Sequence, residues 1–271
     1  MTTLTAANQS TAQDRIRPMG WVESLLMFGV PMLIFIAGFH VVMPALLDAG
    51  LTPFLAYFFP IAGSLTLLLI ASIVAYRLEG NPWEWTAFAE RFRLHRMDGK
   101  TWLWTVGLLV AALVLANLVA AFNGLLIANG VIPYPEWLPL WLQPAVNLPE
   151  GAALFDVYGA AFGGLRGNVT ALLAYYVLLA VNILGEEFWW RGYVLPRQEA
   201  AFGRWTWLIH GTMWCVFHAF KYWELLALLP ITLLITVLAL KTRSTVPPII
   251  VHLVFNGMAL IPLTLSTFGV I

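Results

Sequence analysis

Apolar residues dominate the chain from about residue 21 onward and are interrupted only by short polar or charged clusters. A helix needs roughly 20 consecutive apolar residues to cross a bilayer, and windows of about that length predict seven such helices. The predicted fold class is all-α, a polytopic membrane helical bundle of about seven transmembrane helices. The predicted spans lie near residues 22–47, 54–76, 101–128, 169–196, 205–221, 223–240 and 246–269.

The composition indicates a membrane protein rather than a soluble domain, because 61% of the residues are hydrophobic and only 10% are charged. The formal net charge is zero, so the overall charge gives no sign of nucleic-acid binding. We therefore expect the lipid bilayer, but no nucleic acid, among the partners. The single cysteine, Cys215, excludes an internal disulfide and a cysteine-only metal site.

The basic residues are distributed unevenly between the two sides of the predicted bundle, and only Arg166 and Lys221 fall on one of them. By the positive-inside rule, the other side is cytoplasmic. We therefore expect a multi-pass protein of the plasma membrane with a cytoplasmic N-terminus and an extracytoplasmic C-terminus. The basic residues on the cytoplasmic side are Arg15, Arg17, Arg77, Arg91, Arg93, Arg96, Lys100, Arg191, Arg197, Arg204, Lys241 and Arg243.

The chain divides into four predicted parts. Residues 1–20 form a polar, disordered cytoplasmic N-terminus, and residues 21–128 contain the first three membrane spans with a cytoplasmic amphipathic loop. Residues 129–168 form a proline-rich extracytoplasmic loop, and residues 165–271 form a second membrane domain, for which a resemblance given below implies a catalytic role.

Both long loops carry a pattern of their own. In the loop 77–100, aromatic residues alternate with charged ones, which predicts a short helix in the plane of the lipid headgroups. This helix is either a docking surface or an anchored connector, and we favour the connector. The prolines of 129–168 exclude a regular helix throughout. We expect this loop to fold against the outer membrane surface, as a lid or as a tether.

Two carboxylates and a guanidinium lie in the fourth predicted span, where a charge near the bilayer centre costs about 2.5 to 3.5 kcal/mol. Such residues usually face a protein interior or a wet cavity. Glu187 and Arg191 are four residues apart with the acid first, the favourable order for an ion pair. Glu186 points about 100° away around the helix and has no such partner. The alternative is an interfacial cluster at a helix end that only anchors a loop.

Further polar residues follow at helical spacing. His210, Trp214 and His218 recur every four residues and share one face of the fifth span, and His252 and Asn256 do the same in the seventh. Lone intramembrane histidines often hydrogen-bond between helices, and His40 and His210 fit that role. An acid, two histidines and an asparagine on three helices predict a common polar site.

Depth in the membrane decides which histidine meets Glu186. If the fourth helix continues to Pro196, Glu186 lies about 15 Å from its cytoplasmic end, at the depth of His218. If the helix ends at Arg191, His210 matches Glu186 better. Spacing alone leaves both options open.

The ordered set Glu186-Glu187-x-x-x-Arg191, Trp214-x-x-x-His218 and His252-x-x-x-Asn256 resembles the CPBP family of intramembrane proteases. This family includes the type II CAAX prenyl endopeptidases and proteins described as abortive-infection or bacteriocin-immunity factors. The resemblance covers about residues 165–270. Trp214 stands where phenylalanine is more usual in the family, a change that keeps an aromatic ring.

The resemblance implies an intramembrane endopeptidase acting on a membrane-anchored protein or peptide substrate. Glu186 and His218 would activate a water molecule, and the family pattern thus favours His218 over His210. His252 and Asn256 would stabilise the oxyanion, with Glu187 and Arg191 in supporting positions. Substrates in the family range from prenylated C-terminal tails to unprenylated peptides.

Two chemistries fit these residues. In a glutamate-type mechanism Glu186 is the general base and no metal or other cofactor is needed. In a zinc mechanism, Glu186, His218 and His252 would bind the metal. We favour the first, because the His-Glu-x-x-His spacing of many zinc proteases is absent and Asn256 is not a usual zinc ligand.

An alternative from another functional class is a non-catalytic transporter, immunity or scaffold protein that uses the same polar cavity. The sequence shows neither an internal repeat nor the paired broken helices of many transporters, which argues against a transporter.

Overall fold

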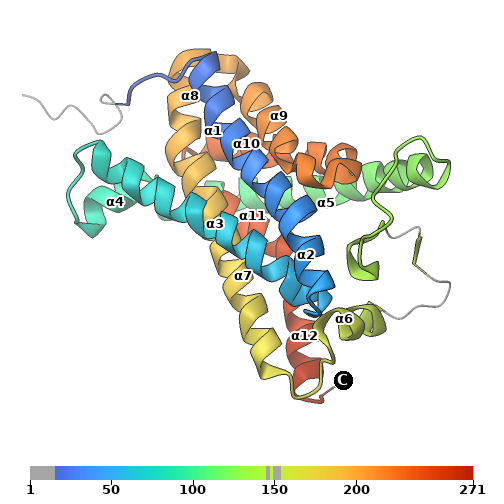
Figure 1. Ribbon diagram of the computed structural model, residues 1–271. Helices are drawn as coiled ribbons and strands as arrows, with labels where there is room; N and C mark the ends of the chain where they lie inside the picture. The colour runs from blue at the N-terminus through green and yellow to red at the C-terminus, as the bar shows by residue number, and fades with distance from the viewer. Residues whose placement is uncertain (1–15, 145–146, 149–153, 271) are drawn as a thin grey trace, which may run out of the picture.

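The computed structural model describes residues 16–144, 147–148 and 154–270, and over these residues the fold is helical without a strand, as predicted (Figure 1). The first half contains α1 (Trp21–Ala37), the π-helical turn η2 (Gly38–Val42), α2 (Met43–Asp48), α3 (Pro53–Leu78), α4 (Trp85–Arg91), α5 (Gly99–Ala128), the 3-10 turn η3 (Leu140–Leu142) and α6 (Leu154–Phe162). The second half contains α7 (Val169–Glu187), the π-helical segment η5 (Phe188–Val194), α8 (Leu195–Phe202), η6 (Gly203–Trp205), α9 (Thr206–Phe217), the 3-10 segment η7 (His218–Glu224), α10 (Leu225–Thr242), α11 (Val246–Asn256) and α12 (Leu260–Thr267).

The chain is a multi-pass membrane protein. In the described part, four continuous helical stretches are long and apolar enough to cross a bilayer: 21–48, 53–78, 99–128 and 169–242. The pair α11 and α12, bent by 51°, would make a fifth span. Predicted spans four to six all fall within the run 169–242, which turns at Gly203 and is kinked at Lys221, so the count of seven stays a prediction. The predicted disorder of the N-terminus concerns mainly residues 1–15, which lie outside the described residues.

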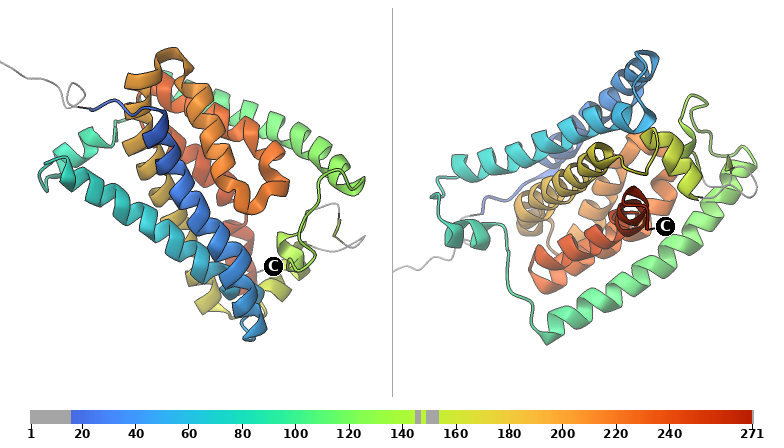
Figure 2. Two further views of the ribbon diagram at one scale, coloured as in Figure 1. Left: turned by 45° about the horizontal axis from the view of Figure 1, so that its top comes forward. Right: turned by 90° about the horizontal axis from the view of Figure 1, so that it is seen from below.

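The bundle has two chemically different ends. We call the end that carries α4, α8 and the turn between α10 and α11 the basic end, and the end that carries η3, α6 and the last turn of α12 the opposite end. Helix α7 runs from the opposite end up to α8, and α3 packs along it (Figure 1). Helices α9 and α10 pack on each other, and α5 covers α10 at the periphery (Figure 2).

Ion pairs connect several helices at the basic end. Glu79 is bound by Arg91, with Nε at 2.6 Å from its Oε2, and also by Arg197. Glu199 contacts Arg93 at 3.1 Å and Arg243 at 3.7 Å. The end of α3, the loop after α4, helix α8 and the end of α10 are therefore joined at one place.

The loop 77–100 contains the predicted short helix, α4. The end of α4 packs against η5, because Arg91 donates to the Gly192 carbonyl at 2.7 Å and the next residue, Phe92, is fully buried. A β-carbon on Gly192 would lie 2.3 Å from the Phe92 ring, so only glycine permits this approach. These contacts fit the connector interpretation, while a position in the headgroup plane stays a prediction.

The loop 129–168 is not a regular helix throughout, as predicted from its prolines; residues 145–146 and 149–153 lie outside the described part. Its ordered elements, η3 and α6, pack on each other and on the first turns of α3. Phe162 stacks on Phe54 with ring centroids 4.1 Å apart, and Trp141 contacts the Tyr57 ring edge-on at 5.2 Å. The described part of the loop is therefore held against the first turns of α3.

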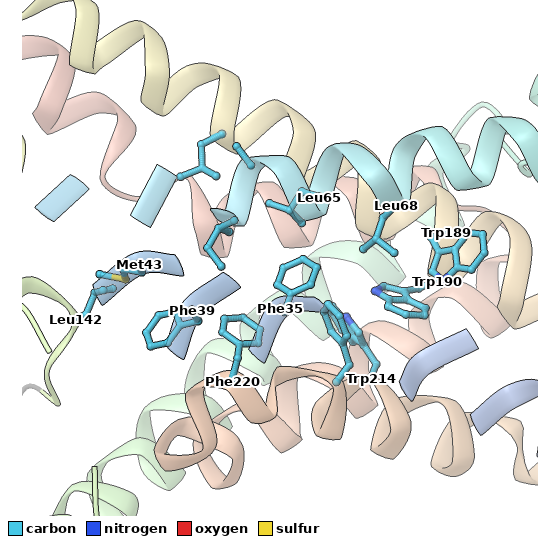
Figure 3. Close-up of a cluster of buried hydrophobic side chains, with 14 of the residues drawn as sticks. Phe35, Phe39, Met43, Leu65, Leu68, Leu142, Trp189, Trp190, Trp214 and Phe220 are labelled. Atoms are coloured by element: carbon cyan, nitrogen blue, oxygen red, sulfur yellow. The ribbon is translucent and has the colours of Figure 1, made fainter. Parts of the chain in front are cut away.

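A row of aromatic rings fills the centre between α1, η5 and α9 (Figure 3). Trp190 stacks on Phe28 at 4.2 Å and meets Phe217 edge-on at 5.1 Å. Phe35 continues the row through Phe217 and Phe220. Trp214 belongs to the same buried cluster and contacts Glu186 near the end of α7.

Candidate active site

Close packing of α7 on α3 places the two glutamates inside the protein. A β-carbon on Gly185 would lie 2.6 Å from the Leu65 carbonyl oxygen, so this glycine lets the two backbones touch. Glu186 and Glu187 follow directly and are both buried. The helical path then continues through η5 and α8 to Phe202. Such π-helical turns frequently occur at functional sites.

Glu186 accepts two hydrogen bonds, one on each carboxylate oxygen. Asn182 Nδ2 donates to Oε1 and Trp214 Nε1 donates to Oε2, each at 2.8 Å. His218 Nε2 lies 3.9 Å from the same Oε2. Within the described chain, Glu186 forms no ion pair with Arg or Lys, as its helical position predicted. It is nevertheless held in place by neutral donors that the spacing argument missed.

His218 is held in one orientation. Its Nδ1 lies 2.8 Å from the Trp214 carbonyl oxygen. A carbonyl oxygen only accepts hydrogen bonds, so Nδ1 carries a proton and donates. In the neutral imidazole, the lone pair of Nε2 is then left facing Glu186. The helix continues past Arg191, so His218 rather than His210 lies at the depth of the acid.

Glu187 links two helices. Its Oε1 lies 3.1 Å from Arg191 Nη1, the predicted ion pair, and 2.7 Å from His252 Nδ1 on α11. The Arg191 guanidinium also covers the face of the Trp214 ring, with its central carbon 3.4 Å from the ring centroid. Arg191 and Glu187 are almost completely buried. The second acid thus fixes His252 and, through Arg191, Trp214.

Asn256 closes the network. Its Nδ2 lies 2.6 Å from Asn182 Oδ1 and 3.0 Å from His252 Nε2. Since the Glu187 carboxylate accepts a hydrogen bond from His252 Nδ1–H, Nε2 of the neutral histidine carries the lone pair and accepts from Asn256 Nδ2. The six polar side chains implied by the resemblance therefore meet in one network, joined by Asn182 and Trp214.

The proposed zinc ligands do not converge in this arrangement. Both ring nitrogens of His252 are engaged, by Glu187 and Asn256, and both oxygens of Glu186 accept hydrogen bonds. Over the described residues, no group of three or more His, Cys, Asp or Glu side chains is placed to hold a metal ion.

The two remaining membrane histidines lie apart from the network. His40 Nε2 donates to the Phe220 carbonyl at 2.8 Å, and His210 Nδ1 lies 2.6 Å from Gln198 Oε1. Both make hydrogen bonds between separate helical segments.

A cavity of about 440 Å³ gives access to the network. Glu186, Trp214, His218, His252 and Asn256 all line it. Its volume falls within the range of about 300 to 1,000 Å³ that is usual for ligand sites. Much of the remaining wall is aromatic or aliphatic.

Asn182 and the indole N–H of Trp214 are the members that the sequence interpretation did not assign. Asn182 stands one helical turn before Glu186 and is the one amide in the apolar run 169–184. That position is a signal that could have identified it. The Trp214 bond crosses between two helices and depends on how they pack, so the sequence carries no comparable signal for it.

Comparison with known proteins identifies a related family for this region. Residues 168–258 match the family described as type II CAAX prenyl endopeptidase Rce1-like. The matched stretch, about a third of the chain, runs from the start of α7 to just beyond α11 and contains the whole polar network. No curated protein and no solved structure matches the chain. The resemblance to the CPBP family is confirmed for this region, and it supports an intramembrane protease.

Proposed function

We propose that the protein is an intramembrane endopeptidase in which Glu186 and His218 activate water to hydrolyse a peptide bond of a membrane-associated protein. The observation that carries this proposal is the 3.9 Å separation between Glu186 Oε2 and His218 Nε2. This distance is too long for a direct hydrogen bond and suits two groups that share one water molecule.

The orientation of both groups favours attack by that water. Glu186 in its ionised form and neutral His218 are both acceptors at the facing atoms, so they would take the two hydrogens of the water. Its lone pairs would then point away, toward a peptide carbonyl in the cavity. A base positioned in this way typically accelerates a reaction by about 10² to 10⁴-fold.

The proton balance follows from this arrangement. The water oxygen bonds to the carbonyl carbon as its proton passes to Glu186, giving a tetrahedral intermediate. The C–N bond then breaks as the protonated Glu186 returns this proton to the leaving nitrogen. The second hydrogen of the water stays on the new carboxyl group, so the products are a carboxylic acid and an amine, which in water become a carboxylate and an ammonium group.

Asn256 would stabilise the negative oxygen of the intermediate, as the resemblance implies. Its amide lies on the cavity wall, and one N–H now bound by Asn182 can turn to a substrate oxygen. His252 can add a second donor only when its Nε2 carries a proton. Donors at such positions commonly contribute several kcal/mol.

The glutamate-type mechanism is preferred to zinc because His252 has no free nitrogen for a shared metal. Cleavage by the purified protein, before and after treatment with a strong chelator, tests this preference together with metal analysis. We expect unchanged activity in metal-free protein. If the chelator abolishes activity and added zinc restores it, the glutamate-type mechanism is wrong and the zinc mechanism applies.

The proposal is tested by cleavage of a membrane-anchored peptide by the purified protein. Glu186→Gln keeps the size of the side chain and removes the base, so we expect loss of cleavage with normal expression. Glu224→Gln changes another acid of the cavity wall and serves as the matched control. Unchanged proteolysis by Glu186→Gln would refute the proposal in favour of a non-catalytic role.

A further inference from the structure

Over the described residues, the cavity extends from the polar network toward one end of the bundle. Beyond the polar network its wall includes Phe54 and Tyr57 on the first turns of α3, Trp141 in η3 and Tyr158 in α6. All four residues lie at the opposite end, where the loop 129–168 packs on α3. The cavity thus extends from Glu186 away from α8.

Buried side chains close the way to the basic end. Trp190, Arg191 and Phe217 are each at most 1% exposed, and Trp214 is 2% exposed. Trp190 packs between the rings of Phe28 and Phe217. Figure 3 shows it beside Trp214 in the central aromatic row. Farther along, the buried pair formed by Gln198 and His210 fills the space between α8 and α9.

The charges of the two ends differ strongly. The ion pairs of Glu79 and Glu199 gather Arg91, Arg93, Arg197 and Arg243 at the basic end. Arg166 and Lys221 are the basic residues of the other end. Lys221 lines the cavity, forms an ion pair with Glu224 at 3.3 Å, and keeps 20% of its side chain exposed, so we take its position as the mouth of the cavity. By the positive-inside rule the basic end faces the cytoplasm.

These three observations point to the origin of the substrate. We infer that the site takes its substrate from the extracytoplasmic face, as an apolar, extended segment of a membrane-anchored protein next to the bilayer. The inference rests on the proposed function for the cleavage itself. The aromatic wall favours apolar side chains, and a peptide bond must leave its helix before a water can reach its carbonyl carbon. A tail exposed only in the cytoplasm would meet the closed end.

The chain offers a direct test of the side on which the mouth opens. Cys215 is its single thiol, and Cys215→Ala supplies a background without cysteine. In that background, Lys221→Cys marks the mouth and Arg204→Cys marks the exposed surface of the basic end. A membrane-impermeant maleimide is then added to intact spheroplasts or to inverted vesicles.

We expect Lys221→Cys to react in spheroplasts and Arg204→Cys only in inverted vesicles. Labelling of Lys221→Cys only in inverted vesicles, or in neither preparation, would overturn the inference. This readout needs no activity, so it remains valid if the protein proves not to be a protease.

Cleavage gives the second readout. A water-soluble fluorogenic peptide with an apolar centre is added to detergent-solubilised protein, to right-side-out vesicles and to inverted vesicles. We expect cleavage in detergent and in right-side-out vesicles, with loss in sealed inverted vesicles. Cleavage in detergent and only in inverted vesicles overturns the extracytoplasmic assignment. No cleavage of this peptide or of a membrane-anchored one in detergent contradicts the proposed function instead.

Discussion

Trp214 Nε1 donates a hydrogen bond of 2.8 Å to Glu186 Oε2, the oxygen that faces His218. Phenylalanine, the more usual residue of the family at this position, could not form this bond. The ring of Trp214 is in turn covered by Arg191, which is paired with Glu187. The second acid of the pair therefore helps to orient the first through an arginine and an indole.

Trp214→Phe separates the hydrogen bond from the packing, because phenylalanine keeps a ring beneath Arg191 but has no N–H. A hydrogen bond to a charged group contributes about 1.5 to 3 kcal/mol. We therefore expect kcat to fall by about tenfold or more, with little change in KM. Steady-state kinetics on the purified variant measure this split. An unchanged kcat would show that the indole N–H does not position Glu186.

Glu187→Gln should destabilise the protein as well as inactivate it. The change leaves the Arg191 guanidinium buried without its ion-pair partner, and breaking a buried pair in this way costs about 3 to 5 kcal/mol. We expect a lower yield and a lower melting temperature in detergent than for Glu186→Gln, which removes no ion pair with Arg or Lys. Equal melting temperatures of the two variants would contradict this division of roles.

Gly185→Ala tests the contact between α7 and α3 beneath the acid. The new methyl group would meet the Leu65 carbonyl at 2.6 Å, and backbone atoms cannot yield as a side chain can. We expect a destabilisation of about 1 to 3 kcal/mol and reduced cleavage as Glu186 is displaced. Gly107→Ala in α5 is the control, because nothing lies within 4 Å of its added carbon. Equal stability of both variants would refute the close approach.

The Glu79 cluster predicts a dependence of stability on pH at the basic end. Burial alone would raise the pKa of Glu79, but the hydrogen bonds and charges of Arg91 and Arg197 outweigh it and lower the pKa below its usual value of 4.5. A depressed pKa in the folded state contributes stability above the unfolded pKa, and this contribution is lost as the pH falls through the folded value. Glu79→Gln should therefore lower the melting temperature at about pH 7 and have less effect near pH 3. An effect that grows on acidification would contradict this account.

Much of the active-site composition could be predicted because it depends on local spacing. The pairing of Glu187 with Arg191 follows from helical periodicity, and His218 follows once the fourth helix extends beyond Pro196. The contacts of His252 with Glu187 and of Trp214 with Glu186 could not be predicted, because they depend on how α11 and α9 pack against α7.

In the fold, too, the features set by local sequence could be predicted, and those set by tertiary packing could not. The long apolar runs predicted α3 and α5 well, since each is one continuous helix. The hydrophobic periodicity gives no signal for the π-helical segment η5 or for the break at Lys221 within η7. For this reason the residues 169–242 could be recognised as helical and apolar, whereas the number of crossings within them stays a prediction.

The central claim is that Glu186 and His218 act together on one water molecule. A double-mutant cycle of kcat/KM with Glu186→Gln, His218→Asn and the double variant tests it most directly. If the two residues act as a unit, their effects are not additive, so the double variant should be about as slow as the slower single variant. If instead the fold-losses of the two single variants multiply in the double variant, the residues act independently and the shared-water mechanism is wrong.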